Sequence, residues 1–196
     1  HDQPLGWMQR IATRLGETTL RQALKQAMRF LANQFVLGEN LGTALARAER
    51  DWQRGYTHSF DMLGEAALTA TDSTRYFTAY RDAIDRVADS QPPAPVFRPS
   101  ISIKLSALHP RYQTAQLELL RRELLPPLKE LCERAAERQL DLTIDAEESD
   151  RLELSLLLLA ELFTLLDTNT RTHIGIVVQA YGKRALAVLE WLHELA

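Results

Sequence analysis

The chain has 196 residues, of which 45% are hydrophobic and 25% are charged, the balance of a folded domain rather than of a disordered segment. Its formal net charge of −3 provides no basic field for a nucleic acid or an anionic membrane. The longest apolar run, Leu152 to Leu166, contains polar interruptions and is shorter than the roughly 20 residues of a transmembrane helix, so it predicts a buried helix.

The single cysteine, Cys132, excludes an internal disulfide and indicates a reducing compartment. It lies within a helical pattern, where the role of a small core residue is commoner than that of a reactive thiol. The first residues contain neither a secretory signal nor an initiator methionine. We therefore expect a cytoplasmic protein and a chain that is a piece of a longer one.

Residues 1–56 have the apolar spacing of helices and are expected to form a helical lead-in segment. One apolar stripe runs from Leu20 to Phe35, and a second helical pattern extends from Asn40 to Arg54, before Gly55. From residue 57 onward, short strand-like runs alternate with helices. The expected strands are Thr57–Leu63, Ile101–Leu105, Leu140–Asp145 and Ile174–Gln179. The first expected helix begins near Asp72, and the next three cover Thr114–Arg138, Arg151–Leu166 and Ala185–Ala196.

Four consecutive strand–helix pairs predict a parallel α/β sheet, and the nucleotide-binding fingerprints GxGxxG and GxxxxGK[ST] are absent. Along the expected strands one face is apolar, and the mixed face ends in a polar residue each time: Asp61, Lys104, Asp145 and Gln179. A doubly wound sheet is apolar on both faces. In a (β/α)₈ barrel the active site lies at the carboxyl ends of the strands. The sequence therefore predicts that residues 57–196 form the first half of a (β/α)₈ barrel.

Two groups of residues could carry chemistry. Lys104 and Asp145 occupy matching positions on consecutive expected strands, where an ion pair could hold a charged substrate or could be a structural salt bridge. The four carboxylates of Asp145–Asp150 could bind a divalent metal ion or could stabilise the start of the next helix. For His58 and His109 we favour structural roles.

Four longer stretches carry a resemblance to a known family. They are Phe60–Ala67 (FDMLGEAA), Ile101–Tyr112 (ISIKLSALHPRY), Ile144–Glu153 (IDAEESDRLE) and Val178–Tyr181 (VQAY). Together they resemble the proline dehydrogenase domain of the bacterial bifunctional proline utilization A flavoenzymes. The helical lead-in, with Gly38 and Glu39, fits the same family.

This resemblance implies FAD-dependent oxidation of L-proline to Δ1-pyrroline-5-carboxylate, with electrons passed to a membrane quinone. Lys104 matches the substrate-site lysine of the family, and Glu65 matches a glutamate that pairs with an arginine when the site closes over substrate. Asp145 matches the active-site aspartate and, with Ala146 and Gln179, is expected to contact the flavin. No metal ligand is implied.

The resemblance also implies an aldehyde dehydrogenase domain in the same parent polypeptide and no nucleic-acid contact from this segment. The parent enzyme would be cytoplasmic, with a peripheral contact to the inner membrane. Because the family's remaining site residues would follow residue 196, we expect the chain alone to be inactive. Two alternative functions stay open: a metal-dependent barrel enzyme that uses the acids of Asp145–Asp150, and an inactive folding or assembly fragment. A homo-oligomer is open as an assembly state.

Overall fold

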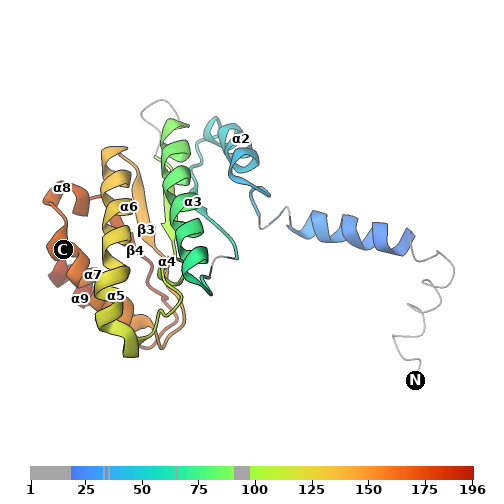
Figure 1. Cartoon of the computed structure of the whole chain (residues 1–196). Coiled ribbons are helices and arrows are strands. Elements are labelled where there is room, and N and C mark those ends of the chain that lie inside the picture. The colour runs from blue at the N-terminus through green and yellow to red at the C-terminus, as the bar shows by residue number, and fades with distance from the viewer. Residues whose placement is uncertain (1–18, 33, 35, 65, 91–97) are drawn as a thin grey trace, which may run out of the picture. The chain divides into compact units, whose positions relative to one another are not determined.

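The computed structural model describes residues 19–32, 34, 36–64, 66–90 and 98–196 (Figure 1). The chain divides into two compact parts, residues 1–50 and residues 51–196. Residues 19–32 are helical, and helix α2 (Leu41–Trp52) follows a short break. Asn40 Oδ1 accepts a hydrogen bond from Thr43 N (3.0 Å) at the start of α2. Gly55 has a φ of 83°, which favours glycine and agrees with the predicted helix stop. Residues 1–18 of the expected lead-in lie outside the described residues.

The C-terminal part contains a parallel sheet of four short strands. They are β1 (Ser59–Asp61), β2 (Ser100–Ile103), β3 (Asp141–Ile144) and β4 (Ile174–Ile176), in the order β1-β2-β3-β4. A doubly wound sheet reverses its strand order at a switch point, whereas a (β/α)₈ barrel places each new strand beside the previous one. The observed order therefore confirms four successive βα pairs of the barrel type.

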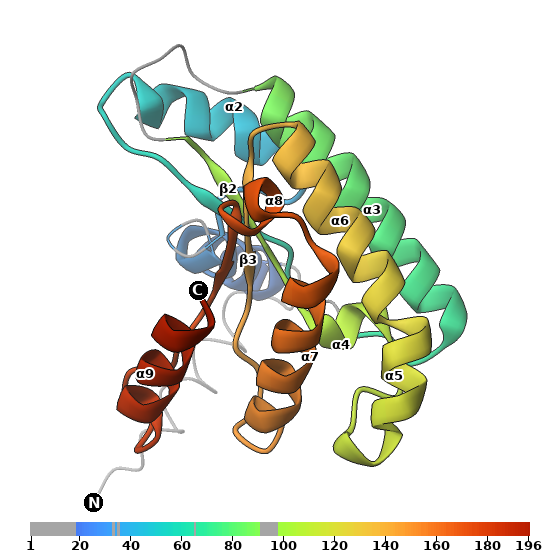
Figure 2. The same cartoon turned by 90° about the vertical axis from the view of Figure 1, so that its left-hand side faces the viewer.

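Helices follow each strand. They are α3 (Ala70–Asp89) after β1; α4 (Leu105–Leu108), the 3₁₀ helix η1 (Thr114–Gln116), α5 (Leu117–Glu123) and α6 (Leu125–Glu137) after β2; α7 (Leu152–Leu165) and α8 (Thr168–Arg171) after β3; and α9 (Ala185–Leu195) after β4. Figure 2 shows α3, α6 and α7 next to one another, and α6 contacts both of the others. Among the described residues, no helix combines the length and hydropathy needed to cross a membrane.

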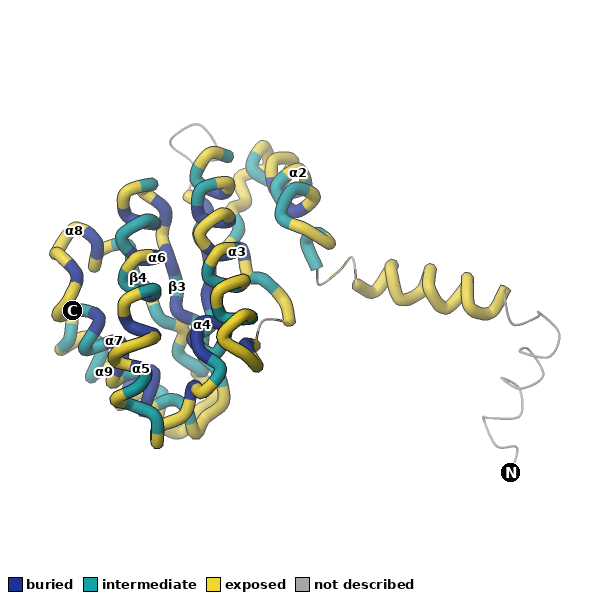
Figure 3. Tube along the Cα trace, in the orientation of Figure 1, coloured by how far each residue is buried: buried dark blue, intermediate teal, exposed yellow. Residues whose placement is uncertain are grey.

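The two faces of the sheet differ as residue alternation predicted. Ile101 and Ile103 of β2, like Leu142 and Ile144 of β3, are buried under the helices, which gives the dark core in Figure 3. On the opposite face of β4 Gly175 is exposed. The apolar face thus carries the helix layer, and the mixed face carries the candidate site residues.

Helix α3 begins at a capping box, because Thr69 and Asp72 exchange hydrogen bonds between side chain and backbone. Asp72 N donates to Thr69 Oγ1 (3.1 Å), and Thr69 N donates to Asp72 Oδ2 (3.0 Å). The side-chain hydrogen bond from Thr69 lowers the pKa of Asp72 below its ordinary value. This cap places the first turn of α3 two residues before the predicted start near Asp72.

The structure corrects several element boundaries. The expected strands Thr57–Leu63 and Ile174–Gln179 are wrong in length, because β1 and β4 each have one partner in the described sheet and pair only over three residues. Leu105 was expected to end the second strand, but it begins α4. The expected helix Thr114–Arg138 is divided near Leu124, and α6 has prolines in its first turn, where their missing N–H groups cost no hydrogen bond. Helix α8 was not predicted; Asp167 caps it by accepting from Thr170 N (2.8 Å).

Candidate functional site at the carboxyl ends of the strands

The predicted pair of Lys104 and Asp145 is formed. Ile103 of β2 pairs with Ile144 of β3, so the two residues that follow lie level. Lys104 Nζ is 2.9 Å from Asp145 Oδ2. It is also 2.9 Å and 3.1 Å from Asp61 Oδ1 and Oδ2, at the end of β1. The ammonium group therefore lies between two carboxylates, of which the sequence predicted one.

The backbone and side chains around this pair are fixed by further hydrogen bonds. Asp145 Oδ1 accepts from Ala146 N (2.9 Å), so both carboxylate oxygens of Asp145 have donors. Lys104 N donates to the hydroxyl of Tyr80 (3.0 Å), and Tyr80 is fully buried in α3. The exposed fractions of the Lys104 and Asp145 side chains are 23% and 24%. The ion pair is thus partly shielded from water. In such a site two charges interact more strongly than they do in bulk solvent.

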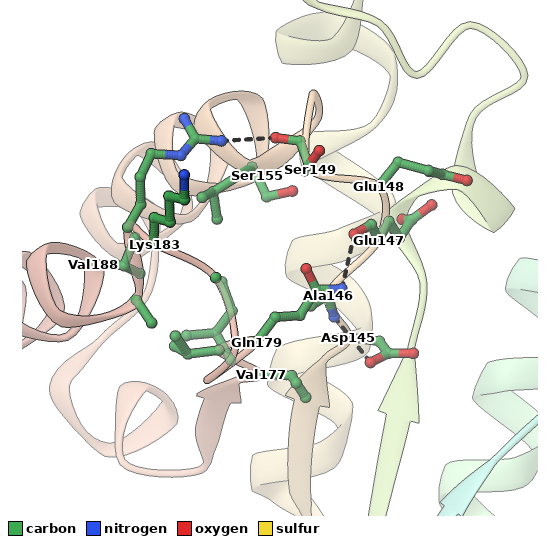
Figure 4. A pocket seen from close by; sticks show the side chains of 16 residues that line it. Asp145, Ala146, Glu147, Glu148, Ser149, Ser155, Val177, Gln179, Lys183 and Val188 are labelled. Atoms are coloured by element: carbon green, nitrogen blue, oxygen red, sulfur yellow. Dashed lines mark hydrogen bonds between the residues drawn. The ribbon is translucent and has the colours of Figure 1, made fainter.

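Gln179 was predicted to end the fourth strand. It lies instead three residues beyond the end of β4. It still turns toward the segment that follows β3, because its Nε2 donates to the carbonyl oxygen of Glu147 (3.2 Å). Figure 4 shows Gln179 beside Ala146 and Asp145, the other two expected flavin contacts. The structure therefore brings these three residues together at the carboxyl ends of β3 and β4.

The acidic stretch 145–150 does not converge on one point. The carboxylate of Glu147 is 8% exposed and accepts from Ser106 N (3.0 Å) and from Arg151 Nη1 (3.0 Å). Arg151 also lies 3.2 Å from Glu148 Oε2. Within the described ranges, no group of three or more histidine, cysteine or acidic residues could hold a metal ion. These carboxylates instead connect the loops after β2 and β3.

His109 has the structural role that was favoured. Its Nδ1 accepts from Arg111 N (3.1 Å), which assigns the proton to Nε2, and Nε2 lies 3.3 Å from Glu123 Oε2. Hydrogen bonds from Arg122 and then from His109 lower the pKa of the Glu123 carboxyl. His58, in the chain before β1, has its Nε2 3.4 Å from Asp51 Oδ2. His109 also contributes to the lining of a cavity that Lys104 lines.

Tyr112 was not identified as a site residue from the sequence. Its hydroxyl lies 2.7 Å from Ser155 Oγ on α7, and burial raises the pKa of Tyr112 above its ordinary value. Ser155 Oγ in turn donates to the carbonyl of Arg151 (3.0 Å). The only sequence signal was its place in the HPRY stretch. This contact joins the loop after β2 to the helix after β3.

Two cavities lie near the strand ends. The larger, of about 550 Å³, is lined by Lys104, Ala146 and Gln179, with Tyr112 and Glu147. The smaller, of about 160 Å³, lies between α7, α9 and the apolar face of β4, where Val188 is labelled in Figure 4. The larger cavity is lined by the predicted substrate lysine, and the smaller by Asp145, while Ala146 and Gln179 line both. The region where the two cavities meet is therefore the candidate site.

Two other sequence expectations concern residues away from this cavity or outside the described ranges. Glu65, the expected substrate-site glutamate, lies outside the described residues. Cys132 is fully buried, and desolvation raises the pKa of its thiol to about 12. Because the thiolate is the reactive form, Cys132 is an inert core residue.

The comparison with known protein families gives a specific match. The proline dehydrogenase family model matches residues 44–196. The bifunctional protein PutA of Escherichia coli is 44% identical over 190 residues, which are 96% of this chain and 14% of that relative. PutA of Rhizobium meliloti is 44% identical over 187 residues, which are 95% of this chain and 15% of that relative. The chain therefore spans only a small part of the length of these relatives.

Solved structures agree with the sequence comparison. A point mutant of Bradyrhizobium japonicum proline utilization A matches with a TM-score of 0.75 at 44% identity, over 95% of this chain and 19% of that one. Proline utilization A from Bdellovibrio bacteriovorus, inactivated by N-propargylglycine, matches with a TM-score of 0.80 over 90% of this chain and 20% of that one. Its 21% identity supports the shared fold alone. Because the family model matches residues 44–196, the chain belongs to the proline dehydrogenase family.

Proposed function

We propose that this chain supplies substrate and flavin contacts for the FAD-dependent oxidation of L-proline to Δ1-pyrroline-5-carboxylate in proline catabolism. The observation that carries the proposal is the Lys104–Asp145 ion pair, which lies beside a cavity of about 550 Å³ at the carboxyl ends of parallel strands. Because the relatives are several times longer, the activity is proposed for the whole protein that contains this chain.

The charges of the candidate site complement those of proline. Proline carries a carboxylate and a secondary ammonium group at neutral pH. Lys104 would bind the carboxylate, and Asp145 would face the ammonium nitrogen and orient it. Lys104 Nζ and Asp145 Oδ2 are 2.9 Å apart before substrate binds. Each side chain would therefore give up part of this contact and contact the zwitterion instead. Glu65 is proposed to help close the site over the substrate.

The residues near β3 and β4 suit a flavin ring. The Gln179 amide uses one N–H on the carbonyl of Glu147, which fixes its orientation and leaves a carbonyl oxygen and a second N–H to offer to the polar edge of the ring. Ala146 presents only a methyl group beside it, and Val177, 38% exposed and directly after β4, offers apolar surface. Bound FAD would supply the two-electron acceptor, while Asp145, Ala146 and Gln179 orient it.

Further partners belong to the whole protein. We propose a membrane quinone as the final electron acceptor. The relatives are named bifunctional, and an aldehyde dehydrogenase domain in the parent polypeptide would consume the oxidised product. Such a domain would make the two reactions consecutive on one polypeptide.

The test uses the full-length natural protein that contains this chain. After gel filtration, its visible spectrum should contain a stoichiometric flavin band, and anaerobic L-proline should bleach it. L-Alanine, which has the same charges but no ring, is the matched control and should bleach it far more slowly. A protein without flavin, or one whose flavin is reduced by dithionite but not by L-proline, contradicts the proposed function.

A further inference from the structure

Asp61 contributes a carboxylate to Lys104 from the side opposite Asp145. Since β2 lies between β1 and β3 in the sheet, the two aspartates approach the ammonium group from the two neighbouring strands. The contacts are 2.9 Å and 3.1 Å from Lys104 Nζ to the two oxygens of Asp61, against 2.9 Å to one oxygen of Asp145. We propose that Asp61 is a positioning residue, which holds the Lys104 ammonium charged and in place for the substrate carboxylate.

The register of the sheet explains how Asp61 reaches the lysine. Asp61 pairs with Ser102, so it lies two residues before the level of Lys104. Phe60, its neighbour, is buried on the helix-facing side, which fixes the direction of Asp61 toward the mixed face. The carboxylate therefore comes from a rigid strand end and from below the level of the lysine, whereas Asp145 lies level with it.

A lysine needs such support more than most side chains do. Its stem has four rotatable bonds, and holding it in one conformation costs side-chain entropy. An opposite charge within about 4 Å favours the charged form of a group. With carboxylates on both sides, the ammonium has a defined position and stays protonated in a partly shielded site. With Asp145 alone, it would lose the contact from the β1 side and part of the electrostatic support for its charge.

The variant Asp61→Asn tests this, because it keeps the size of the side chain and removes its charge. The full-length protein is treated with acetic anhydride at pH 8, and acetylation of Lys104 is followed by peptide mass spectrometry. A lower lysine pKa means more free amine, so we expect acetylation about tenfold faster than in the wild type, which corresponds to one pKa unit. We also expect the KM for L-proline to rise about tenfold, with kcat changed less than threefold.

Two further variants make the result specific. Asp61→Glu keeps the charge and should restore slow acetylation. Asp85→Asn removes an acidic partner of Arg134 on the distant α3–α6 surface and should leave Lys104 acetylation and KM unchanged. Wild-type acetylation of Lys104 in Asp61→Asn overturns the proposal, as does faster acetylation in the Asp85→Asn control. If Asp61→Asn does not fold, slow acetylation in Asp61→Glu supports the proposal, and fast acetylation contradicts it.

This inference rests on the proposed function only for the role of Lys104 toward the substrate. The acetylation rate measures the contact between Asp61 and Lys104 without any turnover. If the wild-type flavin is not reduced by L-proline, the proposed function fails, whereas unchanged acetylation in Asp61→Asn overturns the positioning role alone.

Discussion

Lys104 Nζ and Asp145 Oδ2 lie 2.9 Å apart at level positions just beyond β2 and β3. The sheet register sets this distance, because Ile103 pairs with Ile144 immediately before them. A slip of one residue would turn every side chain of a strand to the other face and would bury Lys104 under the helices. The buried apolar residues of β2 and β3 therefore fix the register of the two strands, and the register fixes the positions of Lys104 and Asp145.

Replacement of Lys104 by Met in the full-length protein should weaken L-proline binding. Methionine keeps most of the length of the stem and removes the charge, so the fold should survive. We expect the affinity to fall at least tenfold, about 1.4 kcal/mol. Titration of flavin reduction against L-proline measures it. Lys129→Met is the matched control, because Lys129 pairs with Glu133 on α6, and equal losses in both variants would contradict a substrate role for Lys104.

Replacement of Gln179 by Leu should change how the protein holds flavin. Leucine has a similar volume but cannot donate to the carbonyl of Glu147 or offer an amide to the ring. We expect a lower flavin content after gel filtration or a shifted flavin reduction potential. Gln116→Leu, in η1, serves as the control with the same chemical change. A Gln179→Leu protein with both properties at wild-type values would show that this side chain is not a flavin contact.

Neighbouring leucines of α7 should differ sharply in their contribution to stability. Leu158 is fully buried, whereas Leu157 is 46% exposed. Leu158→Ala removes core contacts and leaves a cavity, so the free energy of unfolding should fall by about 2–5 kcal/mol. Leu157→Ala should change it by about 0.5 kcal/mol or less. The midpoint of thermal unfolding, followed by released flavin fluorescence, compares the two, and similar midpoints would contradict the orientation of α7.

Stability should fall in acid partly through Asp85. Its hydrogen bonds from Arg134 Nε (2.8 Å) and Nη2 (2.9 Å) lower the pKa of the folded-state carboxyl. A group with a lowered folded pKa stabilises the protein above its ordinary pKa of about 3.9, and this contribution is lost as pH falls through the lower, folded value. Asp85→Asn should therefore lower the melting midpoint at pH 7 and reduce its further loss between pH 5 and pH 3.

The exposed Asp82 of the same helix gives the control for this pH effect. Asp82→Asn should leave both the midpoint at pH 7 and its acid dependence close to the wild type. If Asp82→Asn and Asp85→Asn have the same acid profile, the ion pair between α3 and α6 does not contribute to the pH dependence.

The residue pattern put Lys104 and Asp145 at matching strand ends, and their contact required the two strands to be neighbours. By itself the pattern determined the alternation of strands with helices and the two faces of the sheet. These features depend on alternation along single strands and on the apolar side that each strand must bury, which are local properties. The family resemblance drawn from the four stretches is confirmed by the family match. The roles of Lys104, Asp145, Ala146 and Gln179 toward substrate and flavin stay predictions.

The side-chain contacts between different strands and loops could be determined only from the tertiary structure. Asp61 reaches Lys104 because it pairs with Ser102, two residues before Lys104, and no pattern within one strand contains that offset. Gln179 could be placed beside Glu147 only once β4 was seen to end at Ile176. Similarly, Tyr112 meets Ser155 from a loop 43 residues earlier in the chain. Such contacts depend on sheet stagger and helix packing, which many residues set together and which no single stretch of sequence specifies.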